Sequence, residues 1–376
     1  MTNFRKFQRF LLLLGMCCIY GNILTAQSLS LSLSETLLQS YLSAEFHGQD
    51  VSTEKDQSFG FDNVRIQIED SRAIITTDFW YKKFLSKAKV SPLIDVTGDI
   101  KVSFNAVYLP KKKRVVLTKS SIEHLNLVKG NSLRPLLEPL LKTAIDRIVV
   151  WKKVDRLKIG NQFEFPINNV QVDFLHQSVI VHLNQPSPIP AAMLEQMFVI
   201  VVNESTLNAV LGTISSGLSA RAIGIVKSNV GTQYEMVISG TPSLDIFPGP
   251  DLQSGETRFA LPIALNPVSG DSEKKGSLPL TLILQVVPHL EGSEQEVSIN
   301  LELKNEFDVK TEAFSLQEET WIRPELEAYI TQIGALLSQF KVAVPAIPFI
   351  SNSRRLQLLK ILLEQDQMAL GASIVE

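Results

Sequence analysis

The chain contains the residue types that enzymes use, but none has the spacing of a known catalytic or metal-binding motif. Its five histidines show no metal-binding spacing such as His-Glu-x-x-His. They are His47, His124, His176, His182 and His289. His176 and His182 lie six residues apart in a strand-like segment, which would separate them by about 20 Å, too far to share a metal ion.

The serine and glycine motifs of common enzymes are also absent from the sequence. There is no Gly-x-Ser-x-Gly, P-loop or Gly-x-Gly-x-x-Gly, and residues 212–217 are better explained as the end of a helix. We therefore predict no catalytic residues, no metal site, no cofactor and no enzymatic activity. A pair of carboxylates brought together only by folding remains open.

Two clusters of basic residues could contact anions. Lys111, Lys112, Lys113 and Arg114 follow a Leu-Pro pair at a turn between two expected strands. They are either the soluble tip of a hairpin or a contact for anionic lipid headgroups. The net negative charge of the chain and its expected export argue against nucleic acid as a partner.

The second cluster, residues 80–89, mixes aromatic side chains with lysines. This is typical of segments at a membrane surface, and equally of a partly buried loop whose lysines reach solvent. One strand of a simple meander separates the two clusters, so we expect them at opposite ends of the sheet. They would then not form one membrane contact.

The elements that position these residues are mainly strands. Residues Val64 to Ile68 and Val96 to Tyr108 alternate between apolar and polar side chains, which predicts antiparallel strands with one buried face. The second half shows the same strand-like patterns, in residues 234–238, 278–287 and 297–303. Extended segments, 157–183 and 342–375, close the two halves.

Helices are expected at corresponding places in the two halves. A capping box at Ser32 and Glu35 predicts the start of the first short helix, and Asn203 can cap a second one. Residues 34–42 and 203–211 share Glu, Leu and Leu at an offset of 169 positions. A long amphipathic helix follows the strands of each half, at residues 133–148 and, with Pro324 near its start, at 324–340.

The N-terminus has the features of an export signal. Residues 1–9 carry three basic side chains, residues 10–20 are mainly apolar, and residues 24–26 end in a small residue. The apolar run is about half of the roughly 20 residues that span a bilayer. We expect cleavage after residue 26 and a location in the periplasm, at an outer membrane or outside the cell. A retained anchor and a lipoprotein are the less favoured alternatives.

Length and charge indicate two domains. The 376 residues exceed a single ordinary core, and both cysteines lie within the predicted signal. Three prolines in residues 185–190 predict a stiff connector. We therefore predict a signal at 1–26, a first domain at 27–185, a connector at 186–198 and a second domain at 199–376. Residues 27–185 have a net charge of +4 and residues 186–376 one of −10.

The order of short helix, strands, long helix and closing strands, present twice, resembles the tubular lipid-binding (TULIP) superfamily. This superfamily includes bactericidal permeability-increasing protein (BPI) and lipopolysaccharide-binding protein (LBP). The first half also resembles periplasmic lipoproteins of the YceB type, in residues 33–42 and 136–141. The resemblance implies an α+β fold of two tandem domains, each a highly curved antiparallel sheet wrapped around one long helix. It also implies non-catalytic binding of acyl chains. The chain departs from mammalian members in lacking their disulfide cysteines, and from YceB-type proteins in lacking a lipidation motif.

We expect a phospholipid or a lipopolysaccharide-like lipid as the ligand, and a peripheral membrane contact. Acyl chains would contact the apolar faces of the long helices and of one strand. These residues are Val102, Phe104, Leu136, Leu137, Leu140, Ile330, Ile333 and Leu337. The alternative is a structural or interaction module of the cell envelope with a filled core, and apolar helix faces fit either.

Overall fold

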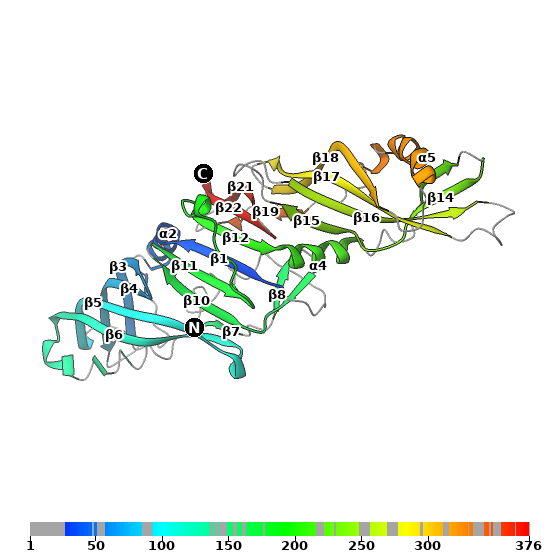
Figure 1. Ribbon diagram of the computed structural model, residues 1–376. Helices are drawn as coiled ribbons and strands as arrows, with labels where there is room; N and C mark the ends of the chain where they lie inside the picture. The colour runs from blue at the N-terminus through cyan, green and yellow to red at the C-terminus, as the bar shows by residue number, and fades with distance from the viewer. Residues whose placement is uncertain are drawn as a thin grey trace.

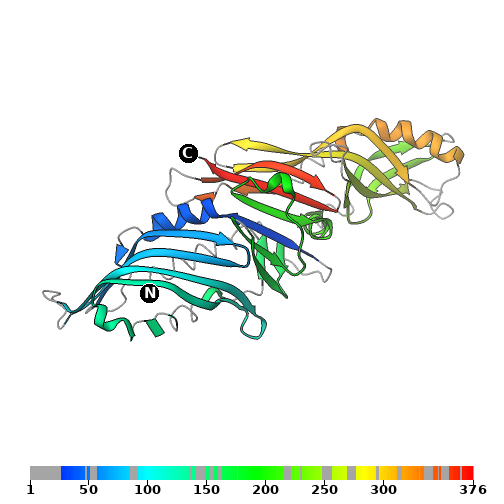
Figure 2. The ribbon, with the colours of Figure 1, turned by 60° about the vertical axis from the view of Figure 1, so that its left-hand side comes forward.

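The computed structural model describes the chain in segments. They are residues 27–46, 49–50, 57–84, 92–135, 138–139, 142, 149–152, 156–159, 163–175, 177–215, 222–228, 231–247, 256–268, 277–293, 296–310, 316–329, 331–333, 342–345, 347–348, 355–364 and 366–375. The molecule is elongated, with a sheet from the first half at one end, a shared sheet in the middle and a sheet from the second half at the other end (Figures 1 and 2).

The sheet of the first half is an antiparallel meander. Its order is β2 (Gln49–Asp50), β3 (Gln57–Glu69), β4 (Arg72–Phe84), β5 (Pro92–Leu109), β6 (Arg114–Lys129) and β7 (Val149–Lys152). The predicted alternation is confirmed, because Val96, Ile100 and Val102 of β5 are buried on one face. Lys82 and Lys83 pair with the start of β5, whereas Lys111 lies beyond its end. As predicted, the two basic clusters lie at opposite ends of the sheet.

The central sheet takes strands from both halves of the chain. Its order is β10 (Val170–Leu175), β11 (Ser178–Leu183), β1 (Leu29–Ser34), β12 (Phe198–Asn203), β22 (Gln367–Val375), β21 (Arg355–Glu364) and β20 (Ile347–Pro348). β1 pairs with β11 on one side and with β12 on the other. The predicted domain boundary is therefore bridged by backbone hydrogen bonds, and the division into two domains remains a prediction.

The connector is not extended throughout. It contains the short 3-10 helix η3 (Ala191–Met193), and Met193 is fully buried against Val199 and Val201 of the central sheet. The prolines predicted the lack of regular strand structure, but they did not indicate that an apolar side chain anchors this segment.

The sheet of the second half is also antiparallel. Its order is β13 (Ala222–Lys227), β14 (Gln233–Ile238), β16 (Glu256–Pro267), β17 (Leu278–Ser293), β18 (Glu296–Lys310) and β19 (Val342–Pro345), with β15 (Ser243–Phe247) paired to β16. Phe259, Ile263 and Leu282 are fully buried on one face. A separate pair consists of β8 (Arg156–Ile159) and β9 (Phe163–Pro166).

The described helices are short. They are α2 (Glu35–Phe46), α4 (Glu204–Ser215), α5 (Leu316–Glu327) and the 3-10 helices η1 (Pro110–Lys112) and η2 (Asn131–Leu133). The predicted cap at Asn203 is confirmed, because its Oδ1 accepts a hydrogen bond from the Thr206 N–H at 3.0 Å. The capping box at Ser32 is wrong, because Ser32 lies inside β1 and pairs with two strands. The capping residue of α2 is Ser34, whose Oγ accepts from the Leu37 N–H at 3.2 Å.

The second long helix starts earlier than predicted. Pro324 lies well inside α5, which begins at Leu316 and ends at Glu327. A turn follows in which the Tyr329 N–H donates to the Leu326 carbonyl, and residues 331–333 are again helical. In the first half, residues 134–135, 138–139 and 142 are helical, and most of the predicted long helix lies outside the described residues.

Polar side chains of α2 and α4, and of the segment at the end of α5, each cover the edge of a strand. Glu35 of α2 accepts a hydrogen bond from the Ile68 N–H at 2.6 Å. Gln39 accepts from the Ile66 N–H and donates to the Val64 carbonyl, both at 2.8 Å. These backbone groups belong to β3, so the helix satisfies groups that would otherwise lie open at the edge.

α4 contacts β15 in the same way. Glu204 accepts from the Ile246 N–H at 3.1 Å, and Asn208 exchanges two hydrogen bonds with the backbone of Leu244, at 2.5 and 2.9 Å. Glu35 and Gln39 occupy the positions of Glu204 and Asn208 at the offset of 169 found in the sequence.

The third contact joins the end of α5 to the edge strand β13. Glu325 accepts from the Lys227 N–H at 3.3 Å. The Tyr329 hydroxyl donates to the Ile225 carbonyl at 2.6 Å and accepts from its N–H at 3.3 Å. A Cβ at Gly224 would clash with the Tyr329 ring, so only glycine admits the ring at this position.

Candidate functional site

The predicted lipid-contacting residues of β5 lie on the buried face of the first sheet. Val102 is 7% exposed and belongs to what we call the first-sheet cluster. Its members are Phe79, Val96, Ile100, Val102, Leu125 and Leu127. Phe104 packs against this cluster. Leu136, Leu137 and Leu140 lie outside the described residues, so the structure brings only the two β5 residues together.

In the second half, only one predicted contact can be placed. Ile333 is fully buried and packs in the large core together with Ile322 and Leu326 of α5. Ile330 and Leu337 lie outside the described residues. The described part of this helix face is therefore packed against protein.

The basic hairpin tip is exposed, as either of its interpretations requires. Lys111, Lys112 and Lys113 are exposed around η1, and Lys113 has a left-handed backbone with a φ of 47°. Arg114 is half-buried at the start of β6. Nothing in the geometry assigns an anion to this tip.

A cavity of about 640 Å³ lies between the first sheet and the central sheet. Its wall is formed by the β3–β4 turn and by parts of β5, β6, β10 and β11. The lining residues are Asp70, Ser71, Asn105, Ala106, Val107, Thr118, Lys119, Val172, Asp173, Phe174, Leu175, Ile180 and His182. The volume is within the range of small-molecule sites, about 300 to 1,000 Å³.

The apolar wall of this cavity continues into the interior of the first half. Phe174 of β10, Ile68 and Ala73 form a second group, the junction cluster. Phe104 packs against both the junction cluster and the first-sheet cluster, and so connects them. Contacts between packed apolar side chains therefore connect the cavity wall with Val102.

A chain of polar contacts begins at the cavity wall and ends at the connector. Asp173 Oδ2 lies 3.3 Å from His182 Nε2, and His182 Nδ1 lies 2.6 Å from Ser30 Oγ. Ser30 Oγ accepts from the Ser187 N–H at 3.0 Å, and the Ser187 and Ser28 hydroxyls are 2.8 Å apart. The connector is thus tied to β1 and β11 through side chains.

This chain has the residue types of a hydrolase triad but not its accessibility. The Ser30 side chain is 0% exposed, and its oxygen already contacts His182 and Ser187, so no substrate can approach it. Burial lowers the pKa of His182, and it outweighs the opposing effect of the Asp173 carboxylate. We interpret the arrangement as a structural link between strands.

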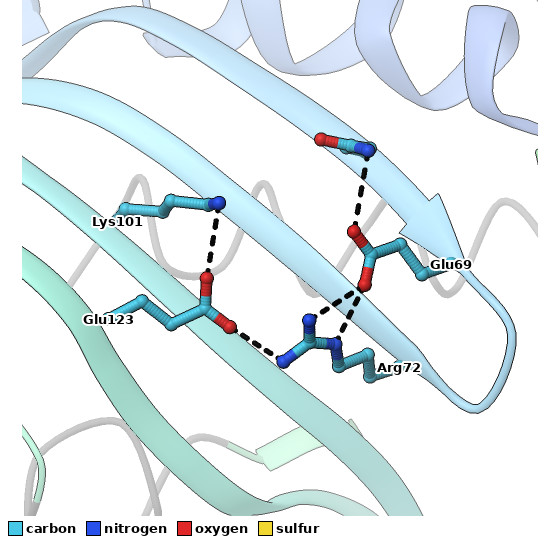
Figure 3. Close-up of polar contacts among 5 residues, drawn as sticks. Glu69, Arg72, Lys101 and Glu123 are labelled. Carbon is cyan, nitrogen blue, oxygen red and sulfur yellow. Dashed lines mark hydrogen bonds and ion pairs between the residues drawn. The ribbon is translucent and has the colours of Figure 1, made fainter.

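Another set of titratable groups lies on the outer face of the first sheet (Figure 3). Arg72 contacts Glu69 at 2.8 Å and Glu123 at 2.6 Å, and Lys101 contacts Glu123 at 3.1 Å. Burial raises the pKa of Glu123, but hydrogen bonds from Lys101 and Ser103 and the Arg72 charge outweigh burial and lower it. Two cations neutralise two carboxylates, which is the pattern of an ion-pair network and offers no free acid or base.

The described residues contain no group of three or more side chains that could hold a metal ion. The described helices are also too short or too polar to cross a membrane. The sequence interpretation missed the cavity residues Asp70, Lys119 and Asp173, because they come from three separate strand regions and share no motif.

Comparisons with known proteins show low similarity to several solved structures. Lipopolysaccharide binding protein matches with 12% identity and a TM-score of 0.36, over 93% of this chain and 99% of that one. P47 of Clostridium botulinum E1 matches with 9% identity and a TM-score of 0.38, over 93% and 99%. P47 from Clostridium botulinum A2 matches with 9% identity and a TM-score of 0.39, over 93% and 97%.

No protein-family profile and no curated protein matches the chain, so the resemblance of the first half to YceB-type proteins has no support here. With TM-scores below 0.5, the structural matches leave the function to be argued from the geometry of the chain itself.

Proposed function

We propose that the protein is an exported, non-catalytic lipid-binding protein that holds or transfers a lipid by its acyl chains in the first half. The observation that carries this proposal is the cavity of about 640 Å³ whose apolar wall continues through Phe104 to Val102. The cavity lining combines charged and polar side chains with apolar ones, which suits an amphiphile, because each part of such a ligand meets its preferred surroundings.

The N-terminal pattern of basic, apolar and small residues supports export of the protein. An exported protein would lie in the periplasm, at an outer membrane or outside the cell. The exposed tip at Lys111, Lys112 and Lys113 would give a peripheral contact with an anionic membrane. The N-terminus of the purified protein and its sedimentation with anionic vesicles test these two parts separately.

The tandem organisation is part of the same proposal. The hydrogen bonds of Glu35 and Gln39 with β3 have counterparts in those of Glu204 and Asn208 with β15, at a constant offset in the sequence. Two copies of one design would account for this correspondence.

A structural role is favoured for the second half. Phe259, Leu282 and Ile333 are fully buried in one large core, which is the packing expected of a filled interior. On this proposal the lipid occupies the first half, and the second half stabilises the molecule or contacts a partner.

Native mass spectrometry after gentle purification, together with uptake of labelled phospholipid by the delipidated protein, tests lipid binding. Ala106→Trp should lower uptake because it fills the cavity. Val128→Trp, at an apolar position that is 76% exposed, is the matched control and should bind normally. Val172→Phe, at a second lining position, provides an independent test if Ala106→Trp does not fold. A lipid-free protein with no uptake would refute the proposal.

A further inference from the structure

The charged groups of the cavity indicate which kind of lipid headgroup it accepts. Asp70 lies in the β3–β4 turn and Lys119 in β6, and both are exposed at the cavity. Neither side chain has a hydrogen bond or ion pair with any residue that the structure describes. The rim thus offers one carboxylate and one ammonium group that have no partner within the described part of the chain.

A second carboxylate lies deeper in the wall. Asp173 is 37% exposed, and its Oδ2 contacts His182 at 3.3 Å and accepts from Gln171 at 2.8 Å. Its other oxygen, Oδ1, has no partner among the described residues. His182 is 7% exposed and is held between Asp173 and Ser30, so it forms a fixed wall of the cavity.

Two carboxylates and one lysine complement a zwitterion that carries an ammonium and a phosphate group. The ammonium would lie between Asp70 and Asp173, and the phosphate would contact Lys119. Charge-assisted hydrogen bonds of this kind are shorter and stronger than neutral ones.

The lining favours a primary amine over a quaternary one. A trimethylammonium group is bound best by several aromatic faces. Phe174 is the only Phe, Tyr or Trp among the described residues of the lining, and it belongs to the apolar junction cluster. A primary ammonium instead needs hydrogen-bond acceptors, which Asp70, Asp173 and the Thr118 hydroxyl supply.

We propose that the cavity binds a phosphoethanolamine headgroup, with the attached acyl chains against the apolar part of the lining, Ala106, Val172 and Phe174. This inference rests on the proposed lipid-binding function and names its substrate class.

The test is titration calorimetry of the delipidated full chain with short-chain phosphatidylethanolamine, phosphatidylcholine and phosphatidylglycerol, each below its micelle concentration. Phosphatidylethanolamine should bind about tenfold more tightly than the other two. Soluble phosphoethanolamine, which lacks acyl chains, should bind at least about tenfold more weakly than the lipid. Equal affinity for the soluble headgroup would overturn a lipid as its source.

Single substitutions test the proposed roles of the Asp70 carboxylate and the Lys119 ammonium group. Asp70→Asn should weaken phosphatidylethanolamine about tenfold and leave phosphatidylcholine nearly unchanged, because asparagine keeps the turn but loses the charge. Lys119→Gln should weaken all three lipids. Asp308→Asn and Lys310→Gln, at exposed positions of β18, are the matched controls and should bind like the parent protein.

The two proposals fail in different ways. If none of the three lipids binds, lipid binding itself is refuted. If all three bind with equal affinity and Asp70→Asn has no effect, lipid binding stands and the headgroup assignment is refuted.

Discussion

Asn208 provides a sharp test of the helix-to-strand contacts. Its side chain accepts a hydrogen bond from the Leu244 N–H at 2.5 Å and donates one to the Leu244 carbonyl at 2.9 Å. Leu244 is 3% exposed. Asn208→Ala therefore leaves two backbone groups without partners where water has little access.

The expected cost follows from these two bonds. A buried polar group that loses its partner costs about 1 to 3 kcal/mol, and alanine returns about 0.5 kcal/mol through its higher helix propensity. For two groups, we expect Asn208→Ala to lower the free energy of unfolding by about 1.5 to 5.5 kcal/mol. Urea unfolding gives this value, and hydrogen exchange at the Leu244 amide should accelerate by about tenfold or more.

Two further variants show whether the bonds themselves matter. Asn208→Asp keeps the acceptor for the Leu244 N–H but loses the donor to its carbonyl, so it should also destabilise the protein. Ser40→Ala is the control, because among the described residues the Ser40 hydroxyl bonds to the Thr36 carbonyl of the same helix and to no strand. If Asn208→Ala stays within about 0.5 kcal/mol of this control and Leu244 exchange is unchanged, the reasoning is wrong.

Three other predictions concern pH and packing. Burial lowers the pKa of His182, so the unfolded chain binds the proton more readily, and stability should fall as pH drops below about 6.5; His182→Gln should flatten this dependence in urea titrations. Burial raises the pKa of Glu204, so Glu204→Gln should leave the thermal midpoint at pH 7 unchanged or higher, and a marked decrease would contradict this. Gly224→Ala should cost about 1 to 3 kcal/mol through its clash with Tyr329, and Tyr329→Ala should relieve most of that cost in a double-mutant cycle.

The strand faces could be predicted from the sequence because side-chain direction in a strand repeats every two residues. This period correctly placed Val96, Ile100 and Val102 on the buried face. The same period runs through Leu29, Leu31 and Leu33, which form a central strand. The capping-box pattern at Ser32 conflicts with this alternation, and the observed capping residue, Ser34, lies two residues later.

The cavity could not be predicted because it depends on distant pairings. Asp70, Lys119 and Asp173 approach one another only when β10 lies against the first sheet. Lys119 also has a left-handed backbone, with a φ of 50°. A lysine in the sequence does not predict this conformation. Periodicity identifies the faces of strands but not which faces of two sheets will meet.

The three helix-to-strand contacts share one geometry that explains the spacing of their polar residues. In each, two residues four apart in the helical segment reach backbone groups two apart on the strand edge. Glu35 and Gln39 reach Ile68 and Ile66, Glu204 and Asn208 reach Ile246 and Leu244, and Glu325 and Tyr329 reach Lys227 and Ile225. Four helical residues rise about 6 Å, and two strand residues span about 6.6 Å.

Because these lengths nearly match, a helix antiparallel to a strand can satisfy two successive outward-facing backbone groups without bending. A polar residue three or five positions away would point about 60° or 140° away from the first side chain around the helix, compared with about 40° for four positions. Side chains of different length can occupy the second position. Gln39, Asn208 and Tyr329 each form hydrogen bonds with both a backbone N–H and a backbone carbonyl of the edge strand. The separation between helix and strand must therefore adjust to side-chain length, whereas the four-residue spacing is fixed by the backbone.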